Sequence, residues 1–287
     1  MQQITIEQVL NWSCQLIDRV DARVLLQYIL HVNHAYLLTH PEEVLVEERS
    51  EAFNKLVMQR VQGMPIAYLT GECAFYDLTF KVSPAVLIPR PETELLIELA
   101  LARIPSDRSY QILDLGTGSG AIAITLAKHC PQAEVVAVDL SADAVSIASM
   151  NTKNLGVDNV CFVRGNWFDG LVGKKFDMIV SNPPYVAEGD PHLKQGDLRF
   201  EPQMALTASD NGLASLSKIT AHAPAYLVAG GWLLLEHGYD QAAVCRQLLA
   251  NTDFSNISSY TDLAGIMRVS GGQFNGSPRT NCWDTAI

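Results

Sequence analysis

The spacing of apolar residues divides the chain into an N-terminal helical part and a longer alternating part. Through residues 1–62 apolar positions recur at intervals of three and four, the period of an amphipathic helix. Thr5 and Gln8 have capping-box spacing, which predicts that a first helix begins after Thr5. Further helices are predicted over 22–31 and 47–61. Together they predict a small helical bundle.

The period changes after residue 66. Residues 75–82 are aromatic and β-branched and lie between Gly71 and Pro84, which predicts a β-hairpin. Pro91 and the acidic residues Glu92 and Glu94 suit the first turn of a helix.

From residue 111 onward, predicted strands alternate with predicted helices. The strands are 111–115, 134–138, 160–163, 176–181 and 232–236, with two more at 258–260 and 266–270. The helices are 121–129, 142–154, 213–229 and 241–249. This alternation is typical of an α/β fold with a doubly wound parallel sheet. We therefore expect a mostly parallel seven-stranded sheet.

These patterns predict four segments: a helical domain over 1–74, a β-hairpin linker over 75–90, an α/β domain over 91–274 and a disordered tail over 275–287.

Composition restricts the class of partner. Of 287 residues, 48% are hydrophobic, which is ample for packed cores. The 20 Lys and Arg against 31 Asp and Glu give a formal charge of −11, which disfavours a stable nucleic-acid partner. Membrane-length apolar runs, a signal peptide and C-x-x-C pairs are all absent from the sequence. We expect a cytoplasmic monomer without membrane contact.

A glycine-rich loop follows the first strand of the α/β part. Its sequence is Asp114-Leu115-Gly116-Thr117-Gly118-Ser119-Gly120, and its glycines let backbone amides approach a ligand. Asp139 ends the next strand, where a carboxylate can accept both hydroxyls of an adenosine ribose. These features fit S-adenosylmethionine or a dinucleotide. The loop alone therefore leaves open a methyltransferase, an NAD-dependent dehydrogenase and a silent nucleotide-binding module.

A second motif, Asn182-Pro183-Pro184-Tyr185, follows strand 176–181 and so lies at the same edge of the sheet. The Asn182 side-chain carbonyl and the Pro183 backbone carbonyl can accept both N–H bonds of one NH₂ group. The prolines hold the backbone rigid, and Tyr185 offers a flat surface for a planar amide or base. The motif favours methylation of an amide or aromatic amino nitrogen.

The glycine loop followed by Asn-Pro-Pro-Tyr resembles the amino-group branch of the class I S-adenosylmethionine-dependent methyltransferases. Flanking segments narrow the resemblance to the glutamine-N5 methyltransferases of peptide chain release factors. These segments are 65–71, 88–94, 190–193, 199–202, 262–265 and 268–269. The likeness covers roughly residues 5–272, nearly the whole chain.

This resemblance implies a Rossmann-like catalytic domain, S-adenosyl-L-methionine as cofactor and S-adenosyl-L-homocysteine as product. It implies cofactor contacts at Gly116, Thr117, Gly118, Ser119, Gly120, Asp139, Trp167 and Asn182. It further implies that Asn182, Pro183, Pro184 and Tyr185 bind the glutamine amide of a Gly-Gly-Gln loop in class I release factors. Of these, Asn182, Pro183 and Tyr185 are the implied catalytic residues. The helical domain would contact the release factor outside that loop.

Two methyltransferase alternatives stay open at this point: one acting on a ribosomal-protein glutamine and one acting on a nucleic-acid amino group. Asp190-Pro191-His192-Leu193 favours release factors. The sequence lacks a Lys/Arg cluster, which disfavours a nucleic-acid substrate.

Several remaining residues carry smaller expectations. Asp77 departs from the family pattern outside the predicted site. The histidines lack metal-ligand spacing, so no metal site is predicted, and His192 and His237 are expected to be structural. Arg199 and Glu201 are expected to orient the loop over 186–211 or to form a solvated ion pair. The chain's own Gly-Gly-Gln, 271–273, is expected to form a turn.

Overall fold

The computed structural model describes residues 4–276. Its contacts divide the chain into two compact units. The helical unit comprises Met1–Glu72 and Pro191–Phe200, and the α/β unit comprises Cys73–Asp190 and Glu201–Ile287. Residues 75–90, expected as a separate linker, fall within the α/β unit, because Phe75 and Phe80 pack in its core. The expected tail over 275–287 lies, from residue 277 onward, outside the described residues.

The helical unit has one apolar core, which includes Ile6, Leu25 and Phe53. Its helices are α1 Ile6–Ser13, α2 Arg19–Leu30, α3 His34–Thr39, α4 Glu47–Val61 and α5 Ile66–Thr70. The predicted capping box is confirmed, since Gln8 N donates to Thr5 Oγ1 at 3.3 Å and Thr5 N donates to Gln8 Oε1 at 3.0 Å. The prediction missed α3 and α5, because helices of six and five residues are too short to establish a period.

A β-hairpin opens the α/β unit, as predicted, with strands β1 Glu72–Phe75 and β2 Leu78–Lys81. Tyr76 in its turn has a left-handed φ of 56°. A short 3₁₀ turn, η1 Pro91–Thr93, then leads into α6 Glu94–Leu101. The Tyr76 amide donates to Glu94 Oε1 at 2.8 Å, which attaches the hairpin to the start of α6.

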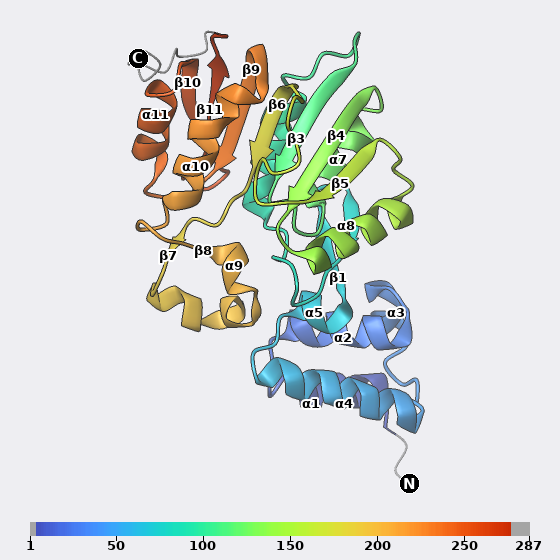
Figure 1. Cartoon of the computed structure of the whole chain (residues 1–287). Coiled ribbons are helices and arrows are strands. Elements are labelled where there is room, and N and C mark those ends of the chain that lie inside the picture. Colours follow the sequence, from blue (N-terminus) through green and yellow to red (C-terminus); the bar gives the residue numbers. More distant parts are fainter. Residues whose placement is uncertain (1–3, 277–287) are drawn as a thin grey trace, which may run out of the picture. The chain divides into compact units, whose positions relative to one another are not determined.

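A seven-stranded sheet with the order β10-β11-β9-β6-β3-β4-β5 forms the centre of this unit (Figure 1). The strands are β3 Tyr110–Leu115, β4 Ala133–Asp139, β5 Val160–Arg164, β6 Phe176–Ser181, β9 Leu227–Glu236, β10 Phe254–Thr261 and β11 Met267–Phe274. Only the pairs made by β11 are antiparallel, so the predicted mostly parallel sheet is confirmed. A separate parallel pair joins β7 Val186–Ala187 to β8 Thr207–Ala208.

Alternate strand residues supply two cores, one on each face of the sheet. Ile112, Met178 and Leu234 pack in the core that contains α6 and α7. Their neighbours, such as Leu113 and Ile179, pack in the core that contains α10 and α11. The helices are α7 Ala121–His129, α8 Ala142–Leu155, α10 Ala214–His222 and α11 Ala242–Ala250. Short elements η2 Pro191–Lys194, η3 Gly196–Phe200, α9 Gln203–Leu206 and η4 Ala223–Ala225 complete the order.

Two local predictions were wrong. The helix expected over 213–229 ends at His222 and passes into η4, because Pro224 cannot continue the helical hydrogen bonds. The internal Gly-Gly-Gln is strand rather than turn, since Gly271 pairs with Leu234 of β9. A Cβ atom on Gly271 would lie 2.8 Å from the Leu233 carbonyl oxygen, so glycine permits the close approach of β11 to β9.

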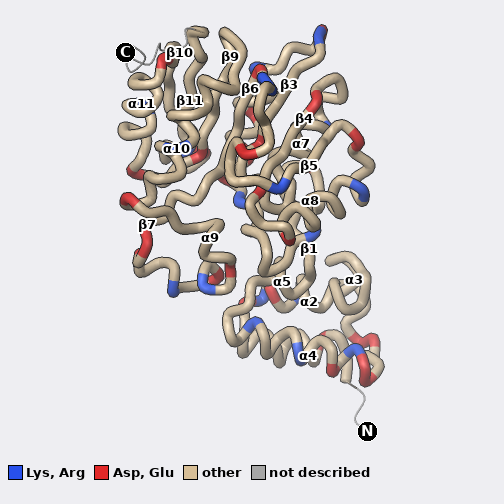
Figure 2. Tube along the Cα trace, in the orientation of Figure 1, with Lys and Arg blue, Asp and Glu red and all other residues tan. Residues whose placement is uncertain are grey.

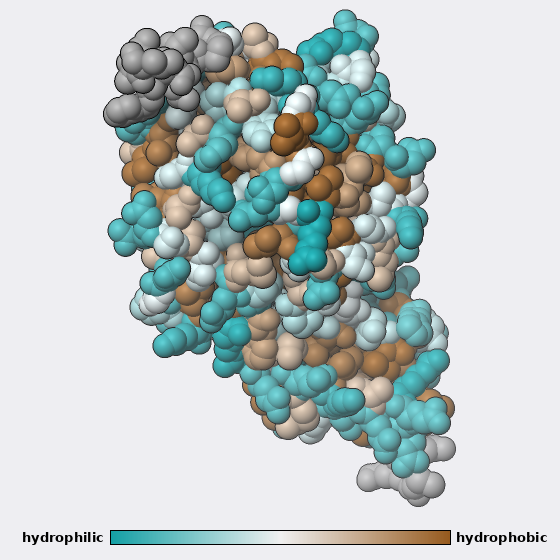
Figure 3. Space-filling model, viewed as in Figure 1, coloured by the Kyte–Doolittle hydropathy of each residue, from teal (hydrophilic) through white to brown (hydrophobic). Residues whose placement is uncertain are grey.

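Charged residues of both signs are dispersed along the described chain (Figure 2). Apolar and polar residues are mixed on the face drawn in Figure 3. Among residues 4–276, no helix is long and apolar enough to cross a membrane.

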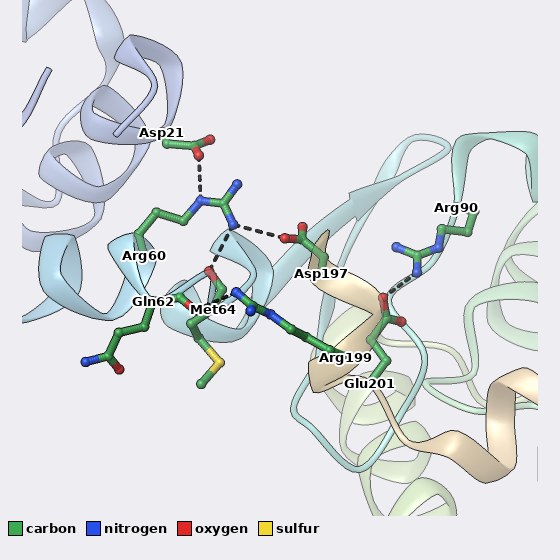
Figure 4. Close-up of polar contacts among 8 residues, drawn as sticks. All are labelled: Asp21, Arg60, Gln62, Met64, Arg90, Asp197, Arg199 and Glu201. Atoms are coloured by element: carbon green, nitrogen blue, oxygen red, sulfur yellow. Dashed lines mark hydrogen bonds and ion pairs between the residues drawn. The ribbon is translucent and has the colours of Figure 1, made fainter. Parts of the chain in front are cut away.

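The segment Pro191–Phe200 leaves the α/β unit after Asp190 and rejoins it at Glu201. It is attached to the helical unit by polar contacts drawn in Figure 4. Arg60 of α4 contacts Asp21 of α2 at 2.6 Å and Asp197 of η3 at 3.0 Å. Arg199 donates to the Gln62 carbonyl oxygen at 2.6 Å. We call Pro191–Phe200 the inserted segment.

We predict that Asp197→Ala loosens the inserted segment without unfolding the protein. The Arg60–Asp197 contact is partly exposed and contributes about 1 kcal/mol, so hydrogen exchange over 191–200 should accelerate roughly fivefold. Hydrogen-exchange mass spectrometry measures this, with Asp158→Ala at an exposed site as the matched control. Unchanged exchange in the segment would contradict the prediction.

Candidate active site

The glycine loop has the left-handed backbone that its sequence requires. Gly116, Gly118 and Gly120 have φ angles of 77°, 56° and 83°, which side-chain-bearing residues rarely adopt. The amides of Gly116 and Thr117 donate to the Val138 carbonyl oxygen at 2.8 and 3.0 Å, which joins the loop to β4. A Cβ atom on Gly118 would meet nothing within 4 Å, so open space lies beside the loop backbone.

Beneath the loop, Asp114 is fully buried. Its Oδ2 accepts from Thr117 Oγ1 at 2.6 Å, while its Oδ1 has no hydrogen-bond partner in the structure as described. Burial raises the pKa of the Asp114 carboxyl to about 7. The Thr117 hydroxyl therefore supports the loop from inside rather than facing a ligand.

Asp139, at the end of β4, braces the glycine loop. Its Oδ2 accepts from Gly118 N at 2.8 Å, and its Oδ1 accepts from Ser141 N at 2.9 Å. Burial raises the pKa of this carboxyl above its usual value. Each carboxylate oxygen retains a further lone pair, so Asp139 can still accept two hydroxyl groups.

Asn182-Pro183-Pro184-Tyr185 begins directly after β6. Ser181 Oγ donates to the Leu115 carbonyl oxygen at 2.6 Å, so the ends of β6 and β3 are joined. Asn182 Nδ2 donates to Thr93 Oγ1 at 3.0 Å. The Tyr185 hydroxyl donates to Glu236 Oε1 at 3.3 Å, and burial raises the pKa of Tyr185. The motif is therefore held by side chains from η1 and β9.

These elements surround a cavity of about 140 Å³. Of the residues predicted from the sequence, those lining it are Gly116, Gly118, Asp139, Trp167, Asn182 and Pro184. Those that do not line it are Thr117, Ser119, Gly120, Pro183 and Tyr185. At Gly120 the reason is helix packing, since a Cβ atom there would lie 2.7 Å from Ile124 Cδ1. The functional roles of all these residues remain predictions.

The donors and acceptors around the cavity fit an adenosine-containing ligand such as S-adenosylmethionine. Asp139 provides two acceptor oxygens, and open space lies beside the Gly118 backbone. Trp167 supplies an aromatic surface on the same cavity, 3.6 Å from where a Cβ atom of Gly116 would be.

Glu201 is a structural residue next to the cavity, and the sequence left its role undecided. Its carboxylate is buried, accepts from Ile88 N at 3.1 Å and forms an ion pair with Arg90 (Figure 4). Of the two alternatives for Arg199 and Glu201, the solvated ion pair between them is therefore wrong, because Arg199 donates to the Gln62 carbonyl oxygen and Glu201 pairs with Arg90. Pro202 and Met204, just after Glu201, form part of the cavity wall.

Other candidate residues have ordinary structural contacts. His237 is buried, with Nδ1 2.8 Å from the Gly238 carbonyl oxygen and Nε2 2.8 Å from Ser270 Oγ, as expected for a structural histidine. Asp77 contacts His129 at 3.0 Å. No group of three His, Cys, Asp or Glu residues suited to a metal ion occurs in residues 4–276.

Comparisons with known proteins match this arrangement. Family models match as "Methyltransferase small domain" over residues 92–197 and "PrmC N-terminal domain" over residues 6–71. A methyltransferase structure from Pyrococcus furiosus covers 77% of this chain and 98% of its own, with a TM-score of 0.53 and 20% identity, which supports the fold.

Full-length relatives are more informative. A release factor glutamine methyltransferase from Xylella fastidiosa is 47% identical over 93% of this chain and 98% of its own length. The Vibrio cholerae protein of the same name is 44% identical over 94% and 97%. The Escherichia coli one is 44% identical over 89% and 92%. The resemblance seen in the sequence is confirmed: the chain belongs to the release factor glutamine methyltransferase family.

Proposed function

We propose that this protein methylates the side-chain amide nitrogen, N5, of the glutamine in the Gly-Gly-Gln loop of class I peptide chain release factors. S-adenosyl-L-methionine is the methyl donor and S-adenosyl-L-homocysteine the product. The observation that carries the proposal is that Asn182 lines the same cavity as Gly116, Gly118 and Asp139. The substrate class is supported by the names of the relatives, which this chain matches over nearly their whole length.

In this proposal the glycine loop, Asp139 and Trp167 hold the cofactor. Asp139 accepts the ribose hydroxyls with lone pairs that its backbone contacts leave free, and Trp167 lies beside the adenine. When bound, S-adenosylmethionine supplies a methyl group on a positively charged sulfur, which a neutral amide nitrogen can attack. The chain's contribution is to bring that nitrogen into line with the methyl group.

Asn182 and Pro183 orient the substrate amide. Asn182 Nδ2 is already engaged by Thr93, so its Oδ1 is the atom left to accept from the glutamine NH₂ group. The Pro183 carbonyl accepts the second N–H. Both acceptors concentrate electron density on a nitrogen whose lone pair is otherwise delocalised. After transfer, the surplus amide proton is released to water.

The helical unit is the proposed recognition domain, contacting the release factor outside the Gly-Gly-Gln loop. It carries exposed apolar side chains, among them Leu16, Val20 and Leu38. The formal charge of −11 also complements a protein that must present basic surface to ribosomal RNA. We take the enzyme to be a cytoplasmic monomer without a stable nucleic-acid partner.

Labelled S-adenosylmethionine and purified release factors test the substrate. We expect label on one peptide, that containing Gly-Gly-Gln, located by mass mapping, and none on a release factor whose glutamine is replaced by alanine. Label on a ribosomal protein or a nucleic acid, with none on release factors, would support the alternative methyltransferases instead.

Asn182→Ala should reduce methyl transfer on the order of a hundredfold or more, because the amide loses its principal orienting acceptor. Binding of S-adenosylhomocysteine, measured by calorimetry, should change little. Asn154→Ala, at an exposed position of α8, is the matched control and should retain full activity. Near-normal turnover by Asn182→Ala, or tight binding of NAD but not of S-adenosylhomocysteine, would contradict the proposal.

A further inference from the structure

Part of the cavity wall is apolar and comes from two short segments that lie far apart in the sequence. Its residues are Ala85, Val86, Leu87, Pro202, Met204 and Ala205. We call these two segments, 85–87 and 202–205, the apolar wall. The glycine loop, Asp139 and Asn182 line the same cavity from the carboxyl ends of the strands.

Neither segment of the apolar wall is held by the central sheet. Residues 82–90 lie outside any helix or strand. The second segment forms α9, a helix of four residues with Pro202 as its N-cap. A helix this short is not stable by itself in water. The position of the apolar wall therefore depends on contacts with other parts of the chain.

Glu201 supplies such contacts between the two segments. It directly precedes Pro202, and its side chain is fully buried. Its Oε2 accepts from Ile88 N at 3.1 Å, and its Oε1 pairs with Arg90 (Figure 4). Both partners follow closely after residue 87. One carboxylate thus joins the end of the first wall segment to the start of the second, across 113 residues of sequence.

The chemistry of these contacts suits a fixed distance. Hydrogen bonds to a charged group are shorter and stronger than those between neutral groups, so they restrain the joined segments more closely than apolar packing would. A buried carboxylate is costly unless its charge is paired and its oxygens are bonded, and here both oxygens have a partner.

We propose that Arg90 and Glu201 are positioning residues that hold the apolar wall against the bound cofactor. The inference rests on the proposed function, because S-adenosylmethionine is the ligand proposed for this cavity. Arg90 and Glu201 are not among the residues that line the cavity, so each acts through the wall segment beside it. The wall excludes water and leaves Asp139 and Asn182 to make the directional contacts.

Glu201→Gln tests the ion pair. Glutamine can still accept from Ile88 N but carries no charge for Arg90. The Kd for S-adenosylhomocysteine, measured by calorimetry, should rise roughly tenfold, and KM for S-adenosylmethionine should rise by a similar factor. The kcat should fall less than about threefold and KM for release factor should stay unchanged, because Asn182 is held by Thr93 rather than by the wall.

Asp177→Asn is the matched control. Asp177 also joins a backbone amide to an arginine, since Oδ2 accepts from Gln111 N at 2.8 Å and Oδ1 from Arg108 Nη1 at 3.1 Å. It lies at the start of β6, whereas Asn182 follows the end of that strand. The control variant should lower thermal stability and leave the Kd for S-adenosylhomocysteine within about twofold of the native value.

Substitutions at Arg90 test the same pair from its more exposed side. The Arg90 side chain is 29% exposed, so Arg90→Gln serves where Glu201→Gln unfolds before its affinity can be measured. It should weaken S-adenosylhomocysteine binding roughly tenfold. Arg90→Lys keeps a positive charge for Glu201 and should bind at least about threefold more tightly than Arg90→Gln.

The outcomes separate this inference from the proposed function. A native Kd for S-adenosylhomocysteine in Glu201→Gln and Arg90→Gln would overturn the positioning role and leave the methyl transfer intact. Equal weakening in Asp177→Asn, or equal affinities in Arg90→Lys and Arg90→Gln, would also overturn it. Weakened binding as expected, with no label transferred to release factors by the native enzyme, would support the positioning role and overturn the proposed substrate.

Discussion

Parallel alignment of four strands is the constraint on which the site depends. Leu115 of β3 pairs with Val138 of β4 and with Ser181 of β6, and Ser181 pairs in turn with Leu235 of β9. These pairs bring four carboxyl ends to one edge of the sheet. Whatever follows each strand must meet there: the glycine loop, the carboxylate of Asp139, the amide of Asn182 and the carboxylate of Glu236. A shift of one residue in any pair would turn these groups to other faces.

Much of the fold and several residues of the site could be predicted from the sequence, because they depend on local patterns. The spacing of apolar residues predicted the bounds of α4 and α7 and the strands that form the sheet. Asp139 and Asn182 were identified because each directly follows a predicted strand. The contacts of Glu201 could not be predicted, because its amide partner Ile88 lies 113 residues away and no period connects them. Glu236 had a visible signal, a carboxylate ending a buried strand, but its partners come from the folded sheet.

Buried carboxylates in the α/β unit differ in how their charge is compensated. Glu201 has a guanidinium and a backbone amide, so its burial is compensated by contacts that join residues 88–90 to the wall of the cavity. Asp114 and Glu236 each leave one oxygen without a hydrogen bond, and burial raises the pKa of both to about 7. Burial of a carboxyl group without full compensation carries a desolvation cost. Both lie next to elements that the proposed chemistry uses.

The inserted segment has a consequence for how this enzyme can be recombined with its relatives. The helical unit is not a simple N-terminal module, because Pro191–Phe200 belongs to it although the chain on either side belongs to the α/β unit. A chimaera that exchanges only the first 72 residues would face a foreign inserted segment, and the partners of Arg60 and Arg199 would come from different parents. Exchange of the whole helical unit therefore requires three crossover points, and substitutions on α4 and in the inserted segment are expected to change together in descent.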